Sequence, residues 1–91
     1  MKLSKFERSQ KAHTRLFDKY IVRFGSFDSN IKADYHSTVL VLQRQSKRVL
    51  SRRDKSIIYS HCYEKVMGNN PSGSTYTRKD YLDVLRRYDK K

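Results

Sequence analysis

Apolar side chains recur every three or four residues along most of this 91-residue chain, which is the spacing of amphipathic helices. The first predicted helix starts after Ser4, because Ser4 and Glu7 have the spacing of a capping box, in which each side chain accepts from the other residue's backbone amide. Gly25 is a typical C-terminal stop for this helix. Its apolar face comprises Phe6, His13, Phe17, Tyr20, Ile21 and Phe24.

The segment Gly25–Asn30 has the composition of a turn, because its residue types accept positive φ angles or make local side-chain hydrogen bonds. We expect it to join two elements. Phe27 is the one large apolar residue inside it, and we expect its ring to fold back onto the core.

The run His36–Gln43 fits both a buried strand and a helix, because it contains four consecutive apolar residues, two of them valines. The helix is favoured, since an apolar stripe continues through the run for longer than a strand usually does, with no glycine or proline. That stripe comprises Tyr35, Val39, Leu42, Val49 and Leu50. The alternative is an α+β fold with a hairpin over Tyr20–Gln43, in which neighbouring elements bury Leu40 and Val41 from both sides.

The same helix is predicted to continue through Gln43–Lys55, a stretch with six basic residues and one acid. On a helical wheel most of these basic residues lie opposite the apolar stripe. Arg53 is the exception, because it falls on the apolar side beside Asp54. Its position indicates that the helix ends or bends near Arg52.

A third helix is predicted to have Asp54 or Ser56 as its cap and to stop at Gly68. Its apolar residues are Ile57, Ile58, Cys62, Val66 and Met67. The segment Asn69–Ser74 follows it and holds the only proline, so it is the clearest predicted loop.

Thr77 and Asp80 have cap spacing ahead of a short final helix. Its apolar face comprises Tyr81, Leu82, Leu85 and Tyr88. The basic residues at its C-terminal end are Arg86, Arg87, Lys90 and Lys91. They complement the helix dipole, so a structural role and contact with a partner are both open for them. The expected fold is mainly α, a small single-domain bundle of three to four helices.

The chain carries 21 Lys and Arg against nine Asp and Glu, a formal net charge of +12. Such an imbalance favours association with nucleic acid, an anionic membrane or an acidic protein surface. The positive charge is clustered on two predicted helix faces, each opposite an apolar stripe. The first cationic stripe comprises Lys5, Arg8, Lys11, Arg15, Lys19 and Arg23, and the second comprises Arg44, Lys47, Arg48, Arg52 and Lys55.

We therefore expect the two stripes to clamp the phosphate backbone of RNA or DNA, which the sequence does not distinguish. Within the second stripe, Arg44, Arg48 and Arg52 form a ridge spaced by four residues. Their replacement by Glu is expected to abolish binding and to leave the fold intact.

Three tyrosines, Tyr59, Tyr63 and Tyr76, are candidates for stacking on bases of a single strand. A position at the edge of the core is the favoured interpretation for each of them, because tyrosine combines an apolar ring with a polar tip.

The candidate metal ligands and nucleophiles are His13, His36, His61 and Cys62. They lack the spacing of a zinc site, and the chain has no nucleophile motif, glycine-rich phosphate loop or gathered set of acids. We therefore expect no metal, no cofactor and no catalysis. The lone cysteine is expected to be a small buried apolar residue. A single cysteine cannot form a disulfide within the chain, which fits a reducing compartment. No signal or membrane-spanning pattern is present, so we expect a soluble intracellular protein.

A second class of function is also compatible with these features. In it, an accessory or inhibitor protein of phage or mobile-element type docks its basic helices on an acidic or nucleic-acid-binding face of a larger host complex. A membrane-surface protein is disfavoured, because the cations lie opposite apolar faces that a core would bury.

Overall fold

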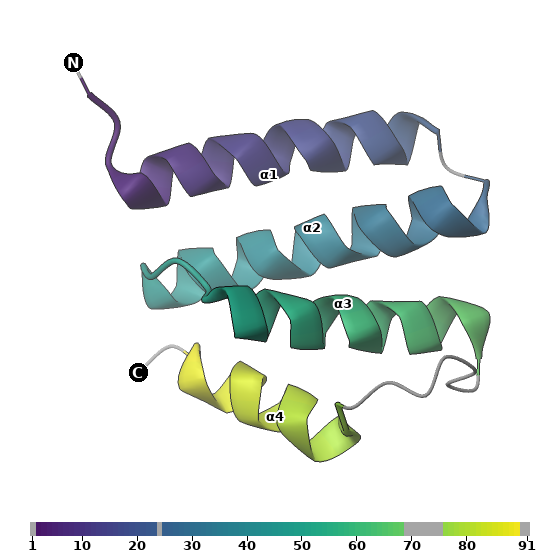
Figure 1. Ribbon diagram of the computed structural model, residues 1–91. Coiled ribbons are helices and arrows are strands. Elements are labelled where there is room, and N and C mark those ends of the chain that lie inside the picture. The colour runs from purple at the N-terminus through teal and green to yellow at the C-terminus, as the bar shows by residue number, and fades with distance from the viewer. Residues whose placement is uncertain (1, 24, 69–75, 90–91) are drawn as a thin grey trace.

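The computed structural model describes residues 2–23, 25–68 and 76–89, which form four helices and no strand. The helices are α1 (Lys5–Val22), α2 (Phe27–Ser46), α3 (Arg52–Met67) and α4 (Arg78–Arg87). Each helix packs against the next one along the chain, in alternating directions (Figure 1). The mainly α fold is confirmed, and two helices occupy the span of the alternative hairpin. Phe24, Asn69–Ser74, Lys90 and Lys91 lie outside the described residues.

Both predicted capping boxes are present. The amide of Glu7 donates to Ser4 Oγ at 3.1 Å, and the amide of Ser4 donates to Glu7 Oε1 at 2.9 Å. Thr77 and Asp80 make the equivalent pair of bonds at 3.2 and 2.9 Å ahead of α4. Gly68 follows α3 with a φ of 89°, a conformation that glycine adopts at little cost.

The turn between α1 and α2 is shorter than predicted. Ser26 Oγ accepts the amide of Ser29 at 3.1 Å, so Ser26 is the N-cap and α2 begins at Phe27. The Phe27 side chain is 66% exposed, and the prediction that its ring folds back onto the core is wrong. The cap places this residue at the first helical position, on a side that no other helix covers.

The predicted continuous helix through Gln43–Lys55 is also wrong, because the chain leaves the helix at Lys47 with a left-handed φ of 61°. The amide of Leu50 then donates to Gln43 Oε1 at 3.0 Å, which holds the connection to α3 against the end of α2. Ser51 caps α3 by accepting the amide of Asp54 at 3.1 Å, so neither Asp54 nor Ser56 is the cap. The bend expected near Arg52 lies five residues earlier.

The hydrophobic core is built by α2, α3 and α4. Its buried residues are Ile31, Val39, Leu42, Leu50, Ile57, Ile58, Cys62, Val84 and Tyr88. In α4, Val84 is fully buried, whereas Leu82, predicted on the apolar face, is 42% exposed. Tyr59, Tyr63 and Tyr76 are half-buried against this cluster, at the edge of the core as favoured from the sequence.

Helix α1 contributes no residue to that buried cluster and lies at the edge of the bundle, against α2 (Figure 1). The contact between α1 and α2 is partly polar. His13 Nδ1 and His36 Nδ1 are 2.8 Å apart, so one ring donates to the other. The amide of the buried Gln43 side chain donates to Gln10 Oε1 at 2.7 Å and to Ser9 Oγ at 3.1 Å. We call these five residues the polar seam.

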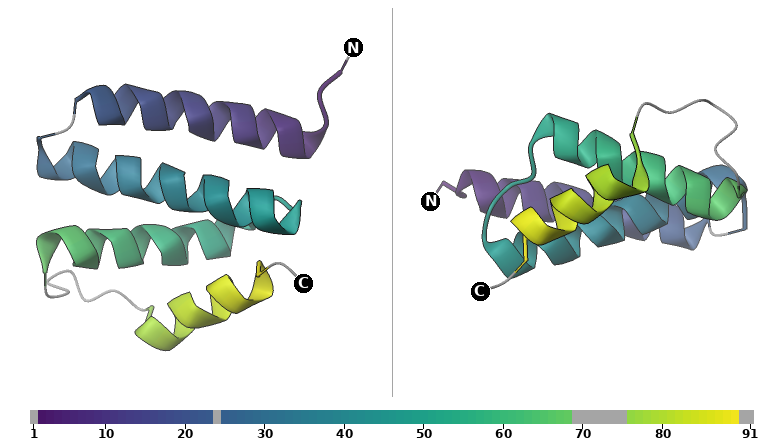
Figure 2. Two further views of the ribbon diagram at one scale, coloured as in Figure 1. Left: turned by 180° about the vertical axis from the view of Figure 1, so that it is seen from behind. Right: turned by 90° about the horizontal axis from the view of Figure 1, so that it is seen from below.

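The resulting molecule is thin, with principal extents of 45 × 31 × 19 Å, and α4 crosses the neighbouring helices at an angle (Figure 2). None of the described helices combines the length and the apolar character that crossing a membrane requires. A thin arrangement leaves much of each helix surface accessible, including the whole outer face of α1.

Candidate functional site

The first cationic stripe is intact in the structure. All six of its members lie on α1 or its C-cap, all are exposed, and they lie on the side opposite the contact with α2. Within the described part of the chain, the ion pairs involve Lys32, Lys65, Arg86 and Arg87, and no member of the stripe. The stripe therefore presents cations that are not neutralised by the protein itself.

The second cationic stripe does not exist as a helix face, because the break after Ser46 divides it. Arg44 is in the last turn of α2, Lys47 and Arg48 are in the connection, and Arg52 and Lys55 are on α3. The ridge of Arg44, Arg48 and Arg52 is therefore a wrong prediction.

Arg48 has structural contacts of its own. Its guanidinium lies 4.8 Å from the centre of the Tyr88 ring and donates to the carbonyl oxygen of Arg87. Replacing it by Glu would disturb the contact between the α2–α3 connection and α4, so the triple Glu variant is not a clean test of binding.

The topology gathers basic residues at one end of the bundle. Because α1 and α3 run opposite to α2 and α4, the starts of α1 and α3 lie beside the ends of α2 and α4 (Figure 1, left). We call this the basic end. Its basic residues are Lys2, Lys5, Arg8, Arg44, Lys47, Arg48, Arg52, Arg53, Lys55, Arg86 and Arg87.

One acid at the basic end is buried and used within the fold. Asp54 Oδ2 accepts from the Tyr88 hydroxyl at 2.8 Å, and its Oδ1 accepts from Arg87 at 2.5 Å. Burial alone would raise the pKa of Asp54, but the hydrogen bonds from Tyr88, Arg87 and Ser51 outweigh burial and lower it. This carboxylate therefore stays ionised and joins α3 to α4, and it is not available to a ligand.

Five rings form a continuous row between α1, α2 and α3, which we call the aromatic seam. Tyr20 stacks on His36 at 6.0 Å between ring centres, and Tyr35 lies 4.7 Å from His36 and 5.3 Å from Tyr59. His13 completes the row from α1, 5.0 Å from His36. Burial lowers the pKa of both histidines, that of His13 to about 4, so both are neutral at pH 7.

Cations lie along the aromatic seam. The ammonium groups of Lys19 and Lys32 are 5.5 and 5.0 Å from the centre of the Tyr20 ring. At the other end of the row, the charge of Lys55 contributes to the lowered pKa of both His13 and His36. The tertiary fold thus brings Lys19 of the first stripe and Lys55 of the second to one row of rings, together with Lys32, which the sequence did not single out.

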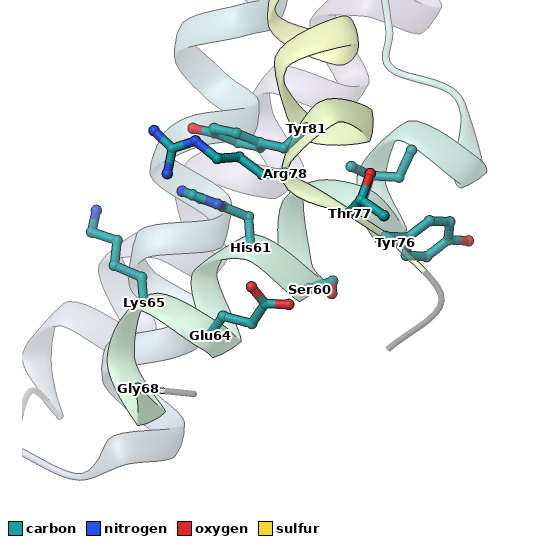
Figure 3. Close-up of a pocket in the computed structure, with 10 residues that line it drawn as sticks. Ser60, His61, Glu64, Lys65, Gly68, Tyr76, Thr77, Arg78 and Tyr81 are labelled. Atoms are coloured by element: carbon teal, nitrogen blue, oxygen red, sulfur yellow. The ribbon is translucent and has the colours of Figure 1, made fainter. Parts of the chain in front are cut away.

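A hollow of about 610 Å³ lies between α3 and α4 (Figure 3). There the rings of His61 and Tyr81 stack 3.6 Å apart and nearly parallel. Lys65 on its rim is paired with Asp34 at 3.2 Å, and Glu64 brings a negative charge. This hollow has mixed charge and lies away from the basic end.

The described residues contain no group of three or more potential metal ligands close enough to hold an ion. Burial raises the pKa of the Cys62 thiol to about 12, so this cysteine is an inert part of the core. The chain was also compared with protein-family models, with curated proteins and with solved structures, and none of them matches. The site is therefore interpreted from its own chemistry.

Proposed function

We propose that this protein binds nucleic acid through the phosphate backbone and performs no catalysis. The single observation that carries the proposal is the first cationic stripe, six exposed cations on one helix face without an acidic partner among the described residues. The basic end adds further cations from the other helices beside the start of this stripe. Phosphates are the ligands that such an array of Lys and Arg attracts, because each contact releases condensed counterions.

The stripe has a suitable geometry for this role. Its members are three or four residues apart, so they follow one another at about 4.5–6 Å along α1 at a rise of about 1.5 Å per residue. Because α1 lies at the edge of the bundle, nothing in the described structure covers this face. A rigid row of cations loses little conformational freedom on binding compared with a disordered basic tail.

The test is binding of duplex DNA, single strands and structured RNA over a range of salt, measured by fluorescence anisotropy. A variant in which Arg8, Lys11 and Arg15 are replaced by Gln is expected to bind about 10- to 100-fold more weakly at 100 mM salt, because three phosphate contacts are lost. The slope of log affinity against log salt is expected to fall by about three.

The matched control removes three cations that lie away from the first cationic stripe and from the basic end, by replacing Lys65, Arg78 and Lys79 with Gln. It lowers the net charge equally, so a much smaller loss of affinity is expected if the stripe is the site. Micromolar or weaker binding with a flat salt slope for every nucleic acid would contradict the proposal, as would equal losses in both triple variants.

The same charges would attract an acidic protein, so the test must separate the two partners. Affinity purification with and without complete nuclease digestion does so. A partner retained after digestion would favour the accessory or inhibitor role inside a host or virus-infected cell, and would count against nucleic acid as the ligand.

A further inference from the structure

A second, smaller hollow lies between α2 and α3, and two rings of the aromatic seam, Tyr35 and Tyr59, line it. It has a volume of about 380 Å³, and its lining residues are Tyr35, Arg52, Lys55, Ser56 and Tyr59. We call it the α2–α3 hollow. Two cations, a hydroxyl and two tyrosines line it, and no acid does.

The cations of this hollow have no counterion in the described structure. Lys55 is half-buried and Arg52 is exposed, and the ion pairs of the described residues include neither. Elsewhere the fold does pair cations with acids, as with Lys65 and Asp34 at 3.2 Å. Partial removal of an unpaired charge from water is unfavourable, and an anion in the hollow would relieve it.

The electrostatics of the neighbouring groups favour an anion in this hollow. Burial lowers the pKa of Lys55, which means that its charged form lacks compensation. The charges of Lys55 and Lys32 add to burial in lowering the pKa of His36. The titratable and charged groups facing this region are Tyr20 and His13 from α1, Asp28, Lys32, Tyr35 and His36 from α2, and Arg52, Lys55 and Tyr59 from α3. Asp28, the acid among them, is paired with Lys32 at 3.2 Å.

The remaining lining groups suit one end of a nucleotide. Ser56 offers a hydroxyl donor, and Arg and Lys are the side chains that hold phosphate oxygens most strongly. The Tyr35 and Tyr59 rings meet edge to face at 5.3 Å and give the hollow apolar walls. In a nucleotide, the phosphate is attached to a sugar and a base, which offer apolar surface beside the charged group. The cations and the tyrosine rings of the hollow suit these two parts.

We infer that the α2–α3 hollow binds a phosphate group of a nucleotide, held by Arg52 and Lys55 from α3. The inference rests on the proposed function, because this phosphate belongs to the nucleic acid bound along the basic surface. The hollow then fixes one phosphate in a defined place, whereas the first cationic stripe supplies contacts that can slide along the backbone.

The test uses the full chain and three small probes: inorganic phosphate, a 5′-phosphorylated dinucleotide and the same dinucleotide without its terminal phosphate. Binding is followed by NMR through the amides of residues 52–59 and the ring protons of the histidines. The phosphorylated dinucleotide is expected to bind saturably at the hollow. It is also expected to raise the pKa of His13 and His36, because the anion offsets the charge of Lys55.

Two variants, Lys55→Gln and Arg52→Gln, are each expected to weaken binding of the phosphorylated dinucleotide about tenfold, the usual effect of losing one charge-assisted hydrogen bond. The second variant keeps the test valid if the half-buried Lys55 proves necessary for folding. The triple Gln variant of Arg8, Lys11 and Arg15 serves as the control and is expected to keep the affinity for the dinucleotide. His61, in the other hollow, should keep its pKa.

The outcomes separate this inference from the proposed function. NMR signal changes spread over the first cationic stripe, with no change in the pKa of His13 or His36, would overturn the inference. A failure of the dinucleotide to bind while long duplexes still bind would also overturn it. If long nucleic acids fail to bind and the phosphorylated dinucleotide occupies the hollow, the proposed function fails and the hollow stands as a phosphate site for short nucleotides. If neither binds, both are overturned.

Discussion

At the scale of single residues, Asp54 shows how one side chain acquires a role that its neighbours do not predict. It sits in the first turn of α3, where the helix dipole alone favours an acid. Its carboxylate instead accepts hydrogen bonds from Tyr88 and Arg87, more than thirty residues away. A carboxylate that is buried and fully bonded is costly to strip of its partners.

The hydroxyl of Tyr88 offers the cleanest perturbation of this contact. Tyr88→Phe keeps the ring in the core and leaves Asp54 Oδ2 without its donor at 2.8 Å. The free energy of unfolding, measured with urea, is expected to fall by about 1–2 kcal/mol.

Tyr81→Phe is the matched control, because the Tyr81 ring stacks on His61 and the hydrogen bonds between helices of the described residues do not include the Tyr81 hydroxyl. It is expected to change the free energy of unfolding by less than about 0.5 kcal/mol. Equal effects of the two substitutions would mean that the bond between Tyr88 and Asp54 contributes nothing.

At the scale of elements, α1 differs from the other helices in how it is attached. The buried apolar cluster lies among α2, α3 and α4, whereas the contact between α1 and α2 is partly polar and includes the polar seam. The two histidines of the seam bond ring to ring, which requires an unprotonated nitrogen on one of them. We therefore expect the docking of α1 to depend on pH.

Acidification is expected to release α1 before the rest of the bundle unfolds. The unfolded chain takes up protons on His13 and His36 near pH 6.5, whereas folded His13 does so only near about 4. The unfolded state binds more protons than the folded state within this window. The free energy of unfolding therefore has its full value above pH 6.5 and decreases as the pH falls toward 4. A loss of about 1–3 kcal/mol is expected.

Amide hydrogen exchange at pH 7 and pH 4.5 can measure this effect helix by helix, after correction for intrinsic exchange rates. Protection in α1 is expected to fall more than protection in α3, which serves as the internal reference. A uniform change in all four helices, or none, would show that the seam does not control the docking of α1.

At the scale of the whole molecule, the order of the helices decides where the charge lies. The up-and-down path brings three separate basic segments of the chain to the basic end. A net charge of +12 on a domain of this size opposes compaction through self-repulsion. The protein is therefore expected to be more stable when its charge is screened.

Thermal unfolding in increasing NaCl tests this expectation. Between about 20 and 500 mM salt, the Debye length falls well below the separation of the helices, so repulsion is screened. Each kcal/mol relieved is expected to raise the Tm by about 4–8 °C. A Tm that falls with salt would mean that the ion pairs outweigh the repulsion.

Much of the fold follows from local sequence. The cap pairs at Ser4 and Thr77 and the stop at Gly68 depend on residues within four positions of one another, and all three are present. The break after Ser46 was missed, although Ser51 and Asp54 have cap spacing that could have located the start of α3. A helical wheel drawn across a break gives a stripe that no helix carries.

The sequence by itself determined the helical class, the caps at Ser4 and Thr77 and the first cationic stripe, because each depends on neighbours along one helix. The pairing of His13 with His36, the use of Asp54 by α4 and the meeting of Tyr35 with Lys55 were decided only by the tertiary structure. These contacts join residues 20 or more positions apart. Their partners are selected by how the helices pack, and no periodic pattern within one helix specifies that.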